Sequence, residues 1–191
     1  MLLTDRSPAD AAPIEAAAYR EAMARLASAV HLVTTDGPGG RAGFTATAVC
    51  SVSDAPPTLL VCINRGSSAY AAFLANARLS VNCLAAGHEP LADSFGRRPL
   101  VERFRVGTWE AGLGGGPVLT DAVAAFQCRI VRRVPTGTHD VLFCEVDAIG
   151  GRGDTALVYG FRRYHPVSRE RADGIALPSA RRGRPTARAL P

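Results

Sequence analysis

The chain has 191 residues, 47% of them hydrophobic, and a formal net charge of +5, which fits one globular domain of ordinary size. No apolar run approaches the roughly 18 residues that a membrane span needs. The N-terminal segment also lacks the charged-then-apolar layout of a secretion signal. We therefore expect a cytoplasmic protein without a membrane anchor.

The positive charge is concentrated at the C-terminal end. All 22 basic residues are arginine, and six of them fall between Arg169 and Pro191, against only Glu170 and Asp173. This segment has few large apolar residues, so we expect a disordered tail over residues 169–191. A basic tail could attract nucleic acid or an acidic partner, or it could be a solvated extension without a function. The rest of the chain gives no indication of nucleic-acid recognition.

At the other end, residues 1–13 are also expected to be disordered, which leaves a folded domain over residues 14–168. Pro13 can begin a helix from Ile14 to about Ser28, because proline is tolerated in the first turn. Apolar residues at i, i+4 and i+7 spacing form one face of that helix and predict a stripe that packs on the core: Tyr19, Met23 and Leu26.

The remaining elements are mostly strands. We expect, in chain order, a hairpin around the turn signal Asp36–Gly40, a strand–helix–strand block, a short helix, an irregular segment, two long strands and a last strand. Many antiparallel strands with few helices predict a small, closed or partly closed β-barrel. The hairpin consists of Val30–Thr35 and a strand that ends at Thr47, and the strand–helix–strand block is Pro56–Ala85. The short helix is His88–Phe95 and the irregular segment is Arg97–Gly116. The two long strands are Ala122–Val134 and Val141–Ile149, joined by Pro135–Asp140, and the last strand is Leu157–Tyr164.

The five cysteines are odd in number and never in C-x-x-C spacing. Each falls in an apolar run that is typical of a strand, where cysteine behaves as a small hydrophobe. They predict buried free thiols in a reducing compartment rather than a zinc or redox site, so no metal is expected: Cys50, Cys62, Cys83, Cys128 and Cys144.

The segment Asn64–Ser68 indicates an anion site. The apolar run Thr58–Ile63 is typical of a strand, and Ser67 fits the N-cap of a helix over Ser67–Asn76. A helix N-terminus offers unpaired N–H groups and a positive dipole end. Arg65 adds a forked cation and the serines add hydroxyl donors, so the segment predicts a phosphate site. An ordinary capped helix beside a surface arginine is the alternative.

The expected strands before and after this segment in sequence carry small polar residues instead of a solid run of large apolar ones. They are Gly43–Ser53 (GFTATAVCSVS) and Arg78–Gly87 (RLSVNCLAAG). Small side chains on a strand leave room for a flat ligand and present hydrogen-bonding groups along its edge.

Together with PPTLLVCINRGSSAY, GTHDVLFCEV and YGFRRYH, these strands resemble the short-chain flavin reductase family, the NAD(P)H-dependent reductase components of two-component flavin monooxygenases. The resemblance runs from about Tyr19 to Val167, with the motifs in the family's order. Within the family it is strongest to the flavin reductases of the pyrimidine-utilisation pathway. It implies a mainly β fold, an FMN-binding split β-barrel of Greek-key type with a few flanking helices, and an FMN site at a homodimer interface.

The resemblance also implies a reaction. A hydride passes from nicotinamide C4 of NADH or NADPH to N5 of FMN, with FAD as an alternative acceptor, and no side chain is required as acid or base. Reduced FMN then diffuses to a separate flavin-dependent monooxygenase. The residues implied are, for the phosphate, Asn64, Arg65, Ser67 and Ser68; for the ring and ribityl chain, Thr45, Ala46, Thr47, Val49, Cys50 and Ser51; on the opposite strand, Asn82, Cys83 and Leu84; and for the nicotinamide side, His139 and Tyr164.

The histidine at position 139 depends most on the resemblance. By itself, a histidine on a turn after Gly137 is typical of a solvated loop residue. In the family, the histidine of this Gly-x-His turn lies beside the flavin ring where the nicotinamide stacks, which implies that role for His139. The family more often has aspartate before the histidine, whereas here Thr138 stands there and Asp140 follows. The hydrogen-bond partner of His139 is therefore left open.

Other polar patterns carry less information. The run Gly112–Gly116 is followed by proline and opens no helix, so it predicts a flexible loop and no dinucleotide fingerprint. His31 and His165 are isolated and are expected to be structural or on the surface. Asp140 and Glu145 are five apart on a strand and so point to opposite faces, which disfavours an acid/base pair.

Two other functions stay open. One is a flavin-binding oxidase or electron carrier of the same barrel type, in which the flavin stays bound and NADH is not used. The other is a non-enzymatic interaction protein that uses the basic tail, which would leave the phosphate motif unexplained.

Overall fold

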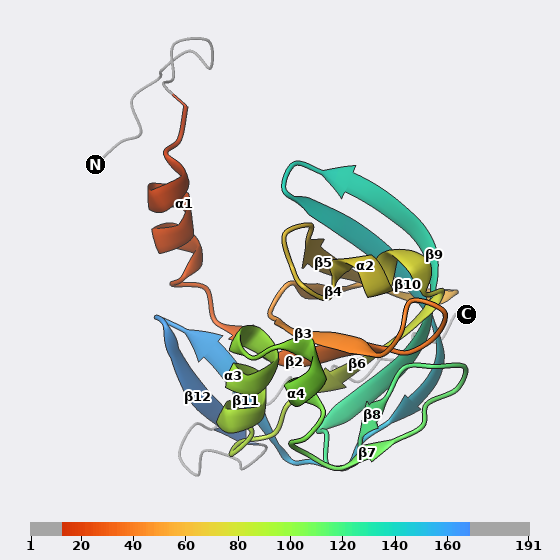
Figure 1. Ribbon diagram of the computed structural model, residues 1–191. Coiled ribbons are helices and arrows are strands. Elements are labelled where there is room, and N and C mark those ends of the chain that lie inside the picture. Colours follow the sequence, from red (N-terminus) through yellow and green to blue (C-terminus); the bar gives the residue numbers. More distant parts are fainter. Residues whose placement is uncertain (1–12, 169–191) are drawn as a thin grey trace, which may run out of the picture.

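A computed structural model describes residues 13–168, and the fold is built mainly from strands (Figure 1). The disorder expected at the two ends falls, apart from Pro13, on residues outside those described. No helix in the described part of the chain is long and apolar enough to cross a membrane. In chain order the elements are α1 Ala16–Met23, β1 Ser28–Ala29, β2 His31–Thr35, β3 Ala42–Ala46, β4 Val49–Asp54, β5 Pro57–Asn64, α2 Tyr70–Ala75, β6 Arg78–Cys83, α3 Glu89–Arg97, α4 Leu100–Arg103, β7 Trp109–Glu110, β8 Val118–Leu119, β9 Ala124–Thr136, β10 His139–Gly150, β11 Thr155–Gly160 and β12 Arg163–Ser168.

Seven antiparallel strands form one sheet in the order β3-β2-β6-β9-β10-β5-β4. Its two edge strands, β3 and β4, follow each other in sequence with only Thr47 and Ala48 between them. Three peptide steps span at most about 11 Å, so the two edges must approach each other at this end. The sheet is therefore curled almost into a cylinder and left open along one seam, which agrees with the predicted split barrel.

The inside of the curled sheet is filled by one face of each strand. In β5 every second side chain is buried, namely Leu59, Val61 and Ile63, as expected when only one face of a strand meets the core. Phe44 of β3 and Phe73 of α2 pack edge to face with ring centroids 5.1 Å apart. This core holds the edge strand β3 against β5, which is the neighbour of the other edge strand, β4.

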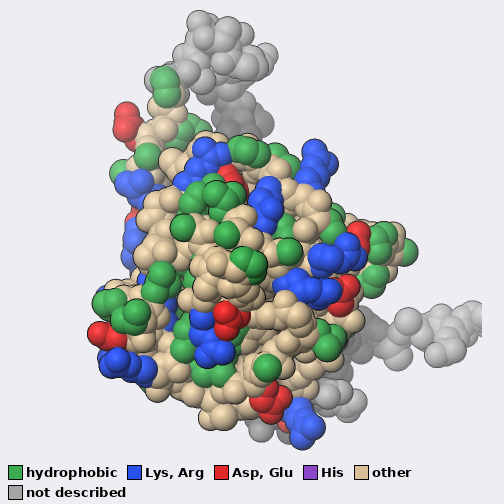
Figure 2. All heavy atoms as spheres, turned by 45° about the vertical axis from the view of Figure 1, so that its right-hand side comes forward, with side chains coloured by type: hydrophobic (Ala, Val, Ile, Leu, Met, Phe, Trp, Pro, Cys, Tyr) green, Lys and Arg blue, Asp and Glu red, His purple; other side chains and the backbone are tan. Residues whose placement is uncertain are grey.

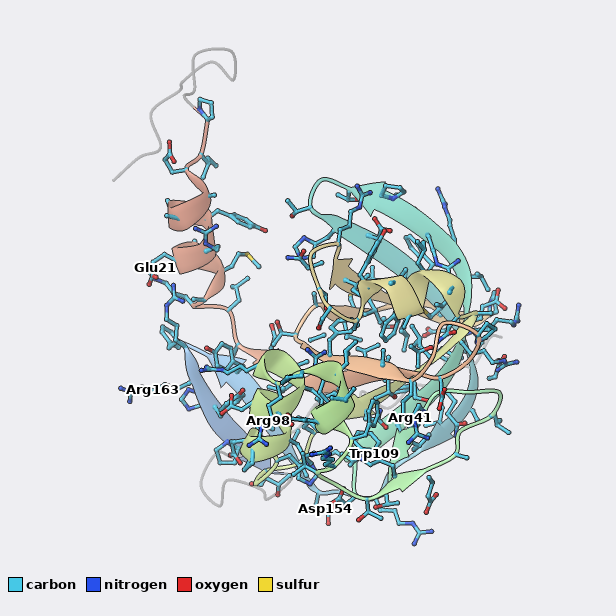
Figure 3. All side chains as sticks on the ribbon, in the orientation of Figure 1. Glu21, Arg41, Arg98, Trp109, Asp154 and Arg163 are labelled. Atoms are coloured by element: carbon cyan, nitrogen blue, oxygen red, sulfur yellow. The ribbon has the colours of Figure 1, made fainter. Side chains whose placement is uncertain are left out.

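A second core lies under α3. It joins α3 to β2 and to the small sheet β1-β11-β12 through buried side chains such as Leu32, Leu91 and Leu157. Phe95, Phe104 and the single tryptophan, Trp109, pack together with ring centroids 5.0–5.4 Å apart; Figure 3 shows Trp109 below α3 and α4. This cluster gives the segment after α3, expected to be irregular, a fixed position.

The prediction for the N-terminal helix is wrong in length and in packing. The helix covers only Ala16–Met23, has no buried residue and stands away from the body in Figure 1. The proposed core stripe is exposed: Tyr19 by 58%, Met23 by 44% and Leu26 by 58%. Spacing alone identified an apolar face, but it could not show whether the rest of the chain provides a surface to cover that face.

The C-terminal strands also differ from the prediction. Leu157–Tyr164 was expected to be one strand, yet β11 and β12 form a hairpin whose turn is Phe161 and Arg162. Upstream, β9 and β10 extend further than expected, so the turn between them shrinks to Gly137 and Thr138.

Candidate functional site

A cavity of about 740 Å³ opens at the seam where the two edges of the sheet meet. Its volume is within the range of roughly 300–1,000 Å³ typical of small-molecule sites. The wall is made by the end of β3 and the β3–β4 link, by the end of β5 with the turn after it, by α3 and α4, and by the start of β10. The lining residues are Phe44, Thr45, Ala46, Thr47, Ala48, Cys62, Asn64, Gly66, Ser67, Ser68, Phe95, Gly96, Arg97, Arg103 and His139.

The turn after β5 places hydroxyl groups at this cavity, although the expected helix boundary is wrong. The helix begins at Tyr70 with Ala69 as N-cap, and not at Ser67. Asn64 Oδ1 accepts the N–H of Gly66 at 2.7 Å, and Ser67 Oγ accepts the N–H of Ala69 at 3.3 Å. Such local side-chain bonds compete with helical ones, so the chain stays in turns and directs both serines to the cavity.

Arg65 does not line the cavity, and its charge is already paired. Its Nε donates to Asp140 Oδ1 at 2.7 Å, and the Tyr70 hydroxyl donates to Asp140 Oδ2 at 2.8 Å. The Arg65 hydrogen bond, followed by that of Tyr70, holds the pKa of Asp140 below its usual value. Glu145 instead pairs with Arg129 at 2.7 Å, so Asp140 and Glu145 serve separate contacts, as their spacing suggested.

Arg103, on α4, is a cavity residue that the sequence analysis missed. Its exposed fraction is 6%. It donates from Nε to the carbonyl of Arg98 at 2.8 Å, from Nη1 to that of Gly43 at 2.6 Å, and from Nη2 to Ser68 Oγ at 2.8 Å. Burial lowers the pKa of its guanidinium. The segment around it carries no spacing signal; only the tertiary contact between α4 and β3 buries this arginine.

His139 does reach the cavity, at the start of β10 beside the end of β5. It is paired in register with Asn64, and the N–H of Arg65 donates to the carbonyl of Thr138 at 3.0 Å. The partner left open by the sequence is Thr138, whose Oγ1 lies 2.9 Å from His139 Nδ1. The β9–β10 turn, which precedes His139 (the histidine turn), and the β5–α2 turn, which contains Ser67 and Ser68 (the serine turn), are thus held together.

A second cavity of about 390 Å³ adjoins the first and shares Thr45–Thr47, Gly96 and Arg97 with it. Tyr164 lines this second cavity, next to Tyr159. The Tyr164 hydroxyl donates to Asp93 at 3.2 Å. Burial, followed by the nearby Asp93 charge, raises the pKa of Tyr164 to about 12.

Besides Arg65, six of the expected residues do not line either of these cavities. Those on β4 lie on the edge strand, where Cys50 and Ser51 are exposed. The expectation that all five cysteines are buried is wrong for Cys50, and Cys62 and Cys83 are only half-buried. Asn82 is fully buried because it bonds the carbonyl of Leu32 and the N–H of Leu119. The six are Val49, Cys50, Ser51, Asn82, Cys83 and Leu84.

The glycine run Gly112–Gly116 lies elsewhere and lines a separate cavity with Asp36 and Arg41. A Cβ on Gly115 would stand 2.2 Å from the carbonyl oxygen of Asp36. Close packing of this loop therefore accounts for the glycine at that position.

The surface charges give no competing site in the view of Figure 2. Arginines are spread over this face, and several have carboxylates beside them. Described ion pairs such as Arg41 with Asp36 and Arg78 with Asp147 follow the same pattern.

Comparison with known proteins identifies the class to which this fold and cavity belong. The model of the flavin reductase like domain matches residues 23–168. FMN reductase (NADH) RutF 1 of Methylorubrum extorquens (strain PA1) is 60% identical over 176 residues, which are 91% of this chain and 87% of that protein. The chain therefore belongs to the flavin reductase family, and the resemblance is confirmed: it is an oxidoreductase, with the pyrimidine-utilisation flavin reductases among its close homologues.

Solved structures agree with this assignment. A protein described as a flavin reductase from Haemophilus somnus is 46% identical, with a TM-score of 0.78 over 81% of this chain and all of that one. The NADH:FAD oxidoreductase SgcE6 of Streptomyces globisporus, in complex with NAD and FAD fragments, is 26% identical with a TM-score of 0.75, covering 88% and 98%. BorF, the flavin reductase component of a bacterial two-component tryptophan halogenase, is 25% identical with a TM-score of 0.74, covering 82% and 100%.

Proposed function

We propose that the protein transfers a hydride from NADH to FMN bound in the seam cavity. The observation that supports this most directly is a cavity of flavin-compatible volume that has hydroxyl groups and a buried arginine on one side and a histidine on another. The relatives named FMN reductase (NADH) favour FMN as the acceptor and NADH as the donor. When bound, FMN supplies the electron-accepting ring, and NADH supplies the hydride.

The residues present fit such a ligand. The phosphate would be held near Asn64, Ser67 and Ser68, where small residues leave hydroxyl groups facing the cavity. The ring and ribityl chain would lie along Thr45–Thr47, whose backbone turns from β3 to β4 without large side chains. The protein contributes position and exclusion of water, because hydride transfer between stacked rings needs no protein acid or base.

His139 would orient the nicotinamide, with Tyr164 on the wall of the adjoining cavity. We expect His139→Ala to raise KM for NADH by roughly 2- to 10-fold, the effect of losing about one hydrogen bond. The KM for FMN should change less. His165→Ala is the matched control, because His165 is exposed and lines neither cavity. Equal KM values for NADH in the His139 variant and in wild type would remove His139 from the donor site.

The reduced FMN would leave the protein and serve a separate flavin-dependent monooxygenase. BorF is the reductase component of a two-component halogenase, and the resemblance to pyrimidine-utilisation reductases makes a pyrimidine oxygenase the partner to test. FAD remains a second acceptor to compare, because SgcE6 is described as an NADH:FAD oxidoreductase.

The active unit would be a homodimer in which the second copy completes the cavity. Three features support this: the seam is open, β4 is an edge strand with unpaired backbone groups on one side, and α1 exposes an apolar face. Sedimentation at micromolar protein, with and without FMN, measures the oligomeric state. A monomer with full specific activity would contradict this part of the proposal.

The reaction itself is tested by mixing purified protein with NADH and FMN and following the absorbance of reduced nicotinamide. We expect oxidation of NADH that depends on added FMN and is slower with NADPH. Folded protein that oxidises neither nucleotide in the presence of FMN would overturn the proposal. Oxygen consumption without any need for NADH would favour a flavin oxidase instead.

A further inference from the structure

Arg103 is buried without a compensating carboxylate. No Asp or Glu oxygen among residues 13–168 comes within 4.0 Å of its guanidinium. Its partners are two carbonyls and the hydroxyl of Ser68, all neutral acceptors. Burying an unpaired charge is costly, so the native position of Arg103 indicates that an anion balances it when the site is filled.

Arg65 differs from Arg103 in this respect. Asp140 neutralises it at 2.7 Å, and its side chain is 41% exposed and turned toward that carboxylate. Binding a phosphate through Arg65 would require sharing it with an existing carboxylate partner. Arg103 has no such competitor and lines the cavity directly.

The serines next to Arg103 are poised as donors. Ser68 Oγ already accepts from Arg103 Nη2, and Ser67 Oγ accepts from the N–H of Ala69. Neither hydroxyl donates to an acceptor among the described residues, so both protons can point to a bound anion. A guanidinium and two hydroxyl groups that converge on one side of a cavity form a site for a phosphate.

We propose that Arg103, and not Arg65, is the cation that binds the phosphate of FMN, with Ser67 and Ser68 as hydroxyl donors. This inference rests on the proposed function, since it assigns one group of the flavin to one part of the same cavity. Arg103 is then the residue that separates FMN from riboflavin, which lacks the phosphate. Arg65 is a positioning residue that holds the serine turn to β10 through Asp140.

The test compares dissociation constants for FMN and riboflavin, measured by flavin fluorescence, in wild type, Arg103→Met, Arg65→Met and Arg105→Met. We expect Arg103→Met to weaken FMN binding by about 10- to 100-fold, the range of a charge-assisted hydrogen bond, and riboflavin binding far less. Arg105→Met removes the same charge two residues along from an exposed position outside the cavity, and should leave the ratio of the two constants unchanged. Arg65→Met should weaken both flavins alike.

Equal losses for FMN and riboflavin in the Arg103 variant would overturn the proposal, as would a loss confined to FMN in the Arg65 variant. If Arg103→Met does not fold, as judged by thermal unfolding, Arg103→Lys and Ser68→Ala take its place. Arg103→Lys should retain most of the preference for FMN, and Ser68→Ala should lose about 2- to 10-fold in FMN binding alone. A Ser68→Ala variant with an unchanged ratio would count against the site.

The same measurements separate this inference from the proposed function. If wild type neither binds nor reduces either flavin, the proposed function fails. If wild type reduces both flavins and the Arg103 variant keeps the wild-type ratio, only the assignment of the phosphate fails. If the Arg103 variant has a higher KM for NADH and an unchanged ratio of the dissociation constants for FMN and riboflavin, Arg103 contacts NADH, which would also overturn the assignment.

Discussion

Two hairpin turns lie beside the two cavities, and they differ in which residues adopt left-handed backbone. The β9–β10 turn, Gly137-Thr138, has its positive φ of 57° at glycine, the residue best suited to it. The β11–β12 turn has positive φ at both residues, 51° at Phe161 and 59° at Arg162, and neither is glycine. Left-handed backbone at ordinary residues costs roughly 1–2 kcal/mol each, so the second turn depends on contacts from elsewhere in the fold.

Those contacts come from α1. The N–H of Phe161 donates to the carbonyl of Ala24, just after the helix, at 2.6 Å. Arg162 Nη2 pairs with Glu21 at 2.7 Å, and Figure 3 shows Glu21 on the outer side of α1. The β9–β10 turn is instead tied inward, through Arg65 and Asp140. The turn that carries His139 is therefore fixed by its glycine and by the partly buried Arg65–Asp140 ion pair, whereas the turn beside Tyr164 is fixed by a segment far away in sequence.

The largest loss of stability is expected at Asp140, which ties the β9–β10 turn to the Asn64–Ser68 turn through Arg65. Asp140→Ala removes a buried carboxylate that accepts from both Arg65 and Tyr70, and breaking a network of hydrogen bonds around a buried group is among the most destabilising changes. Of the four variants in this series, it should lower Tm most and raise KM for NADH, because it loosens the turn of His139. Thermal unfolding and steady-state kinetics measure both; a wild-type Tm would show that the ion pair contributes nothing.

The pH dependence of stability shows whether the charge of Asp140 is responsible for this loss. Because Arg65 and then Tyr70 lower the folded-state pKa of Asp140, its contribution is complete above the unfolded value of about 3.9 and is lost as pH falls toward the folded value. The stability gap between wild type and Asp140→Ala should therefore close below about pH 4. A gap that is constant from pH 7 to acid would mean that the variant acts through packing and not through charge.

Breaking the glycine turn should have the next largest effect. Nothing lies within 4 Å of a Cβ built on Gly137, so Gly137→Val tests backbone conformation at a position where the Cβ meets open space. We expect a loss of about 1–2 kcal/mol in the free energy of unfolding from the left-handed strain, or roughly 2–8 °C in Tm. Gly150→Val is a control at the end of β10, where a Cβ also meets open space but the backbone is not in the left-handed region. An equal loss in both variants would assign the effect to something other than the turn.

The contrast between the turns also explains how far the sequence could lead. The apolar run Thr58–Ile63 is a local signal that predicts β5, and the alternating strands on either side of Pro135–Asp140 predict the β9–β10 hairpin. Phe161 and Arg162 carry no turn signal, so the sequence predicts a single strand where the structure has the β11–β12 hairpin. In the same way Arg103 owes its burial to packing of α4 on β3, which no spacing encodes, while the charge of Arg65 suggested a phosphate contact that Asp140 competes for.

Relieving the strained turn should have a smaller effect, of opposite sign. Asn occupies left-handed backbone more readily than Phe and is favoured in two-residue hairpin turns. Phe161 is 68% exposed, so Phe161→Asn loses little burial and keeps the N–H that binds Ala24. We expect a gain of about 0.5–1 kcal/mol in the free energy of unfolding, seen as a higher Tm. A lower Tm would mean that the Phe161 ring has a packing role, for example against a second copy of the chain.

The smallest effect is expected from the ion pair between α1 and the strained turn. Both side chains are more than half exposed, 57% for Glu21 and 61% for Arg162, and exposed pairs often contribute nothing measurable because water and salt screen them. Glu21→Gln should therefore leave Tm and both KM values unchanged within error, at low and at high salt. The backbone bond from Phe161 to Ala24 would then be the main tie between α1 and the turn. A drop of several degrees in Tm that disappears at high salt would show instead that charge holds the helix to the turn, and that the left-handed backbone of Phe161 and Arg162 is stabilised through it.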